Sequence, residues 1–82
     1  MHESGLVEQL IREVEKIATS NGAGRVVRIE LGIGELAGFS REHFEEHFRT
    51  ASSGTIVNGA VLDLHMVDGD SLLLKAVEVE DA

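Results

Sequence analysis

The first three residues of the chain carry donor atoms for a metal ion. Met1 offers a free α-amine, and His2 adds its main-chain nitrogen and its imidazole. These three nitrogens close fused chelate rings, which favour a flat, nitrogen-rich coordination suited to Ni(II) or Cu(II) and not to Ca(II) or Mg(II). Glu3 can add a carboxylate oxygen. Met1, His2 and Glu3 are therefore the predicted metal ligands, and a solvated chain end is the alternative interpretation.

A second histidine pair lies in the middle of the chain. The run from His43 to His47 matches the H-x-x-E-H pattern of one class of zinc protease, and both imidazoles would share a helix face. A hydrolase also needs a third ligand and an open coordination position. A small metallohydrolase that uses His43 and His47 is kept as an alternative to two exposed histidines on an acidic helix.

The other reactive residue types do not assemble into a catalytic pattern. His65 follows Asp63 on a predicted strand, on the side opposite the apolar residues, and is expected at the surface. The glycines at 32 and 34 lack the lysine and the third glycine of phosphate-binding loops. No catalytic residue and no cofactor-binding loop is predicted, so the chain is not expected to be an enzyme.

Composition limits the class of protein. A chain of 82 residues forms one small domain. Its net charge of −8 argues against binding nucleic acid or an anionic membrane surface. The absence of cysteine removes disulfides and thiolate metal sites, and it fits a reducing cytoplasm. With no signal peptide and no long apolar run, a soluble, cytoplasmic protein is expected.

Apolar spacing predicts a first helix over residues 5–20. Ser4 is the expected N-cap, and Asn21-Gly22 is the expected stop, because both residues tolerate a left-handed conformation. The residues expected to face the core are Leu6, Val7, Leu10, Ile11, Val14, Ile17 and Ala18. The predicted metal ligands would thus precede the first turn of a helix.

Residues 25–33 alternate and predict a strand with one wet face. Its apolar side is expected to consist of Val27, Ile29, Leu31 and Ile33. Arg28 and Glu30 would point the other way, which indicates that helices cover only one side of the sheet. The glycines that follow predict a bulge or a turn where a side chain would clash.

A second helix is predicted from Ser40, which caps it, with Phe39 packing on Phe44 as a hydrophobic staple. Residues 52–54 should end it. Strands are predicted over residues 60–67, with Leu62, Leu64 and Met66 on one face, and over residues 71–80. Asp68-Gly69 predicts a tight hairpin that pairs these two strands.

In that hairpin Leu64 would face Leu73 and Leu62 would face Lys75. Either the lysine stem snorkels to the surface or a bulge shifts the register. The element order is helix, strand, helix, strand, strand. The fold class is therefore α+β, a two-layer α/β arrangement in which a three-stranded mixed sheet carries two helices on one face, with a right-handed crossover between the first two strands.

Three segments together resemble a known family. They are the start Met1-His2-Glu3 before an amphipathic helix, the run Gly32-Ile33-Gly34-Glu35-Leu36, and the ending from Gly69 to Glu80. In combination they resemble HypA, the nickel metallochaperone of [NiFe]-hydrogenase maturation. The resemblance implies that His2 is the essential nickel ligand, assisted by Met1 and Glu3. It also implies a HypB-type GTPase and the hydrogenase large subunit as partners.

The sequence departs from this family in one large respect. HypA proteins carry a zinc domain with two Cys-x-x-Cys pairs between the last two strands, whereas here Val67 leads through Asp68-Gly69 directly to Ser71. We therefore expect residues 1–82 to form a single nickel-binding domain without zinc, natural or engineered. Ser40 stands where some family members have an acidic residue that can complete the nickel site.

Two further expectations follow from this resemblance. A metal-independent docking domain for the GTPase is the alternative to a nickel-delivering module. A shortened loop between strands also favours exchange of elements between copies, so a homodimer is possible.

Overall fold

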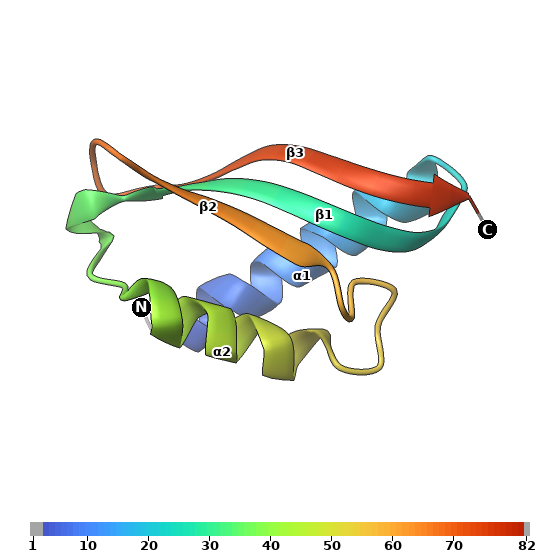
Figure 1. Cartoon of the computed structure of the whole chain (residues 1–82), viewed down its shortest axis with the longest axis horizontal. Coiled ribbons are helices and arrows are strands. Elements are labelled where there is room, and N and C mark those ends of the chain that lie inside the picture. The colour runs from blue at the N-terminus through green and yellow to red at the C-terminus, as the bar shows by residue number, and fades with distance from the viewer. Residues whose placement is uncertain (1–2, 82) are drawn as a thin grey trace.

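The computed structural model describes the backbone of residues 3–81 and the side-chain environment of residues 5–81. The elements are α1 (Glu3–Ser20), β1 (Ala23–Gly34), the short 3-10 helix η1 (Glu35–Ala37), α2 (Arg41–Ser52), β2 (Val61–Val67) and β3 (Leu72–Asp81). The strands form one mixed sheet, and α1 and α2 both lie against the same face of it (Figure 1). The predicted fold class and element order are confirmed.

The first helix packs through the predicted apolar stripe. Its buried residues are Val7, Leu10, Ile11, Val14 and Ala18. Ile17 was expected beside them, but 38% of it is exposed, because it lies at the flank of the stripe near the end of α1. The end itself is as predicted: the Asn21 side-chain amide donates to the Ile17 carbonyl at 2.8 Å, and Gly22 has a φ of 70°.

The start of α1 differs from the prediction. Helical backbone already includes Glu3 and Ser4, so Ser4 lies in the first turn and is not the N-cap. No proline or glycine precedes it to stop the helix, and an acidic residue in the first turn suits the positive end of the helix dipole. Within the described residues the helix is thus already formed at Glu3, two residues earlier than the predicted start at residue 5.

β1 is the central strand of the sheet, and the order of strands is β2-β1-β3. It pairs in parallel with β2, where Leu31 lies opposite Leu64, and antiparallel with β3, where Leu31 lies opposite Leu74. The predicted hairpin between β2 and β3 is therefore wrong, as are the pairs it implied for Leu73 and Lys75. A central β1 gains hydrogen bonds on both edges, which the most buried strand of the sheet requires.

Residues 68–71 carry the chain from β2 to β3 across the end of β1. The Gly34 N–H donates to the Ser71 carbonyl and the Leu36 N–H donates to the Gly69 carbonyl, both at 2.8 Å. Gly69 has a φ of 96°, but Asp68 does not have a positive φ, so the predicted tight turn is not formed. Residues 68–70 instead form a bend between two strands that are not neighbours. A Cβ on Gly34 would collide with the Gly69 carbonyl oxygen and would lie 2.8 Å from the Asp70 nitrogen.

The alternation of β1 is interrupted near its start. The pairing with β3 shifts register between Val26 and Arg28. Val26 is consequently buried and Val27 is only half-buried, the reverse of the prediction. The Val26 N–H donates to the Ile56 carbonyl at 2.9 Å, which ties the loop after α2 to β1 and lets Val57 enter the core.

The second helix is as predicted. Ser40 Oγ accepts from the His43 N–H at 3.1 Å, and the Phe39 and Phe44 rings lie 6.0 Å apart. Phe44 and Phe48 are buried. On the edge strand β2, Leu64 is buried and Leu62 packs on the core, but 48% of Met66 is exposed, because it lies near the end of a strand with a neighbour on one side only.

Replacing Gly34 by alanine is expected to lower the free energy of unfolding by about 1–3 kcal/mol, since backbone at the crossing has to move to admit a methyl group. Urea denaturation measures the change. Gly5→Ala is the matched control: nothing lies within 4 Å of a Cβ there, so this helical substitution should be neutral or stabilising by up to ~1 kcal/mol. Equal midpoints for Gly34→Ala and the parent protein would refute the steric account.

Candidate functional site

The predicted ligands Met1 and His2 lie outside the described residues. Glu3 is described only as the first residue of α1. The structure describes the helix that follows them: α1 contacts α2, β1 and β3. Since Val7 and Leu10 anchor its first half in the core, the backbone that follows His2 belongs to a packed helix and not to a loose arm.

Ser40, the position of the missing acidic ligand, has a structural task. Its hydroxyl caps α2 by accepting the His43 N–H. A neutral cap of this kind supplies no carboxylate to a metal ion.

His43 and His47 lie on the exposed side of α2. The only group of three or more histidine and acidic side chains with converging donor atoms, among residues the structure describes, is elsewhere. The third ligand that a metallohydrolase requires is therefore not gathered on α2 in this part of the chain.

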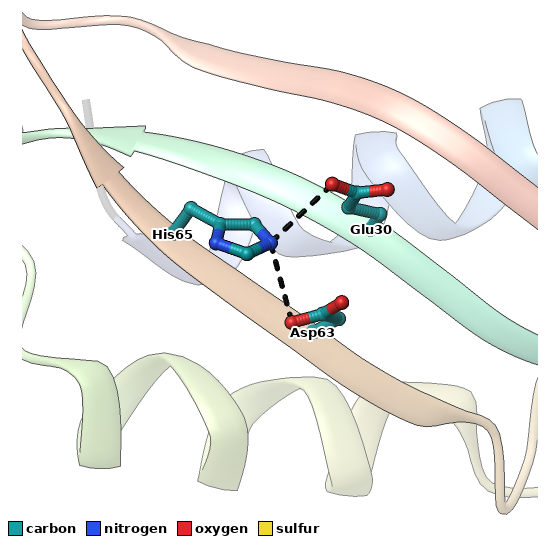
Figure 2. Close-up of side chains that lie close together, drawn as sticks. All are labelled: Glu30, Asp63 and His65. Carbon is teal, nitrogen blue, oxygen red and sulfur yellow. Dashed lines mark ion pairs between the residues drawn. The ribbon is translucent and has the colours of Figure 1, made fainter.

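The converging group consists of Glu30 on β1 and Asp63 and His65 on β2. It lies on the sheet face that the helices leave open (Figures 1 and 2). His65 Nε2 is 3.3 Å from Glu30 Oε2 and 3.3 Å from Asp63 Oδ1, and the three donor atoms all lie within 4.8 Å of one another. We call Glu30, Asp63 and His65 the open-face cluster.

The parallel register assembles this cluster. Glu30 is paired with Asp63, and Gly32 is paired with His65, so the imidazole lies diagonally across from Glu30. Alternation correctly predicted His65 at the surface beside Asp63, and Glu30 on the wet face of β1. The proximity of Glu30 to Asp63 and His65 was not predicted, because the sequence does not show which strand pairs with β1 or in what register.

Arg28 holds the carboxylates of the cluster from the other side. Its guanidinium Nη2 pairs with Asp63 Oδ2 and lies 3.9 Å from Glu30 Oε1, while its Nη1 lies 3.6 Å from Glu78 Oε1 on β3. Arg28 thus contacts one oxygen of each cluster carboxylate and His65 contacts the other. A single cation on the central strand links all three strands of the sheet.

The charge around Arg28 is unbalanced. Glu30, Asp63 and Glu78 contribute three carboxylates against one guanidinium. The nearby Lys75 extends its stem over Gly32, with its Cε 3.3 Å from where a Cβ on Gly32 would lie. The open face is therefore locally acidic at the cluster, in keeping with the net charge of −8 of the whole chain.

No helix in residues 3–81 combines the length and the apolar character that crossing a membrane requires.

Comparison with known proteins identifies the class of this two-layer domain as a metallochaperone. The sequence model of the family described as "Hydrogenase/urease nickel incorporation, metallochaperone, hypA" matches residues 1–77. The chain belongs to the HypA family, which is a family of metallochaperones and not of enzymes.

Curated relatives carry the same name. The hydrogenase maturation factor HypA of Nitrosospira multiformis is 41% identical over 64 residues, which are 78% of this chain and 56% of that protein. Its counterpart in Rhodobacter capsulatus is 32% identical over 83 residues, covering 98% of this chain and 74% of that protein. The chain spans little more than half the length of the relatives from N. multiformis and Chlorobium limicola.

Solved structures share the fold. The solution structure of the Ni metallochaperone HypA from Helicobacter pylori matches with a TM-score of 0.87 and 21% identity, over 100% of both chains. A second solution structure of a HypA protein matches with a TM-score of 0.78 and 23% identity, over 96% of both chains.

The link between Arg28 and Asp63 is expected to contribute modestly to stability, because both side chains are about one-third exposed and water screens the pair. A double-mutant cycle of Arg28→Ala and Asp63→Ala should give a coupling energy of about 0.5–1 kcal/mol in urea denaturation. Arg12, exposed on α1, is the control: Arg12→Ala should add to Asp63→Ala without coupling. A coupling of zero between Arg28 and Asp63 would mean that the pair does not brace the sheet.

Proposed function

We propose that this domain is a nickel-delivering chaperone module that binds Ni(II) through Met1, His2 and Glu3. The observation that carries the proposal is the start of α1 at Glu3, within a chain whose match to the HypA family begins at residue 1. In the sequence, the two residues that carry the α-amine, the His2 main-chain nitrogen and the imidazole directly precede this packed helix. A site with few protein ligands allows the metal to be exchanged, as a carrier requires.

The partners follow from the family. A HypB-type GTPase is the proposed docking partner, and the hydrogenase large subunit is the proposed final acceptor. Transfer occurs when a partner offers competing donors to the exposed ion. In support, relatives that match most of this chain are named hydrogenase maturation factors.

We also infer that the module works without a zinc domain. The 82 residues contain no cysteine, and only residues 68–71 separate β2 from β3. In this short segment Gly69 and Ser71 are bonded to the end of β1, so the connection is an integrated part of the sheet. Within these 82 residues the proposed function therefore uses Ni(II) and no zinc site.

Calorimetric titration of the untagged protein, beginning at Met1, with Ni(II) tests the site. His2→Ala should remove it, and so should one residue added before Met1, because the first loses the imidazole and the second moves the free amine out of the chelate. His43→Ala is the matched control on α2 and should titrate like the parent protein. Unchanged stoichiometry and affinity in both altered proteins would refute the N-terminal site.

Acid should weaken nickel binding at this site. Coordination by the amine and the main-chain nitrogen displaces protons, so the apparent affinity is expected to fall as pH is lowered. Titrations at a series of pH values measure this, with the extended protein as the control. A pH-independent affinity would show that these nitrogens are not the ligands.

The docking alternative is separated from metal delivery by one experiment. If the module delivers nickel, His2→Ala should still bind the GTPase but should no longer pass nickel to it or to the large subunit. Delivery by His2→Ala at the parent rate would leave a metal-independent docking domain as the function.

A further inference from the structure

The open-face cluster has the donor set of a metal site, and it is separate from the proposed N-terminal site. We propose that Glu30, Asp63 and His65 bind one divalent first-row cation, Ni(II) in a nickel-loaded cell, as a second metal site of this domain. This goes beyond the proposed function, which needs only Met1, His2 and Glu3. None of the cluster residues is shared with the N-terminal set, and the cluster lies on the sheet face opposite α1 (Figures 1 and 2).

The two distances from His65 to the carboxylates fit a shared ion. Ligands that bind one such ion at about 2.0–2.2 Å stand about 3.0–3.5 Å from one another. His65 Nε2 already lies 3.3 Å from an oxygen of Glu30 and 3.3 Å from an oxygen of Asp63 (Figure 2). Both separations exceed the usual length of a hydrogen bond, whereas they match neighbouring positions around a metal.

The imidazole cannot satisfy both carboxylates by itself. One ring nitrogen carries either one proton or one lone pair, so it can donate one hydrogen bond at most, yet two carboxylate oxygens face it. A divalent cation between the three atoms would satisfy the nitrogen lone pair and both oxygens together.

Arg28 orients the two carboxylates of the cluster. It contacts Asp63 Oδ2 and Glu30 Oε1, and it leaves Asp63 Oδ1 and Glu30 Oε2 facing His65. Hydrogen-bonded outer groups orient metal ligands in this way in known metal sites. Glu30, Asp63 and Glu78 contribute three carboxylates around Arg28, and the nearby Lys75 leaves a net negative charge that favours binding of a cation.

The donor set also decides the kind of ion. One imidazole and two carboxylates, with water in the remaining positions, suit Ni(II), Co(II) or Zn(II) in a tetrahedral or octahedral geometry. The N-terminal chelate instead favours a flat arrangement of nitrogens. The two sites should therefore differ in geometry when both hold nickel, and the exposed sheet site should bind the more weakly.

The test uses the full chain in a His2→Ala background, which isolates the sheet site. Titration with NiCl₂ alone should show one bound ion in His2→Ala. Adding His65→Ala should weaken that binding about tenfold or more, and Asp63→Asn, which keeps the side-chain shape, should weaken it similarly. Adding His43→Ala, the matched control on α2, should leave it unchanged.

Proton NMR of the imidazole signals supplies an independent readout. Ni(II) added to His2→Ala should first shift and broaden the signals of His65 and spare those of His43. Unaltered binding in the His2→Ala, His65→Ala double variant, or broadening centred on the α2 histidines, would overturn the sheet site. Failure of the N-terminal site would give a different result: His2→Ala would then bind as many nickel ions as the parent protein.

Discussion

The structure depends on the position of β1 between two strands that run in opposite directions. β2 is parallel to it and β3 is antiparallel, so the short connection between them must pass over the end of β1. That passage is possible because Gly34 has no side chain and because its N–H and that of Leu36 bond to the crossing segment. A larger residue at this position would force the crossing segment away from the strand end.

The two faces of the sheet acquire different properties from this arrangement. One face is covered by α1 and α2 and contains the aliphatic and phenylalanine core. The other is open and collects charged residues from all three strands around Arg28. The helix face supports the start of α1, where the family's nickel chemistry is proposed, while the open face gathers a second set of donors.

Short-range patterns were mostly reliable, although the predicted Ser4 cap was wrong. The period of α1, the Asn21-Gly22 stop, the Ser40 cap and the contact of Phe39 with Phe44 all depend on residues less than six positions apart. Errors arose where distant segments intervene. A register shift against β3 buried Val26 in place of Val27, and the crossing over β1 turned the expected hairpin into a connection between strands that do not touch.

The sequence by itself determined the elements, the wet face of β1, the surface position of His65 and the resemblance to HypA, because periodicity, capping and motifs are local properties. Only the tertiary structure decided that β1 is central and that Glu30 lies beside Asp63 and His65. The physical reason is that alternation assigns a strand residue to a face but not to a neighbour. Partner and register are selected by packing and hydrogen bonding across the whole sheet.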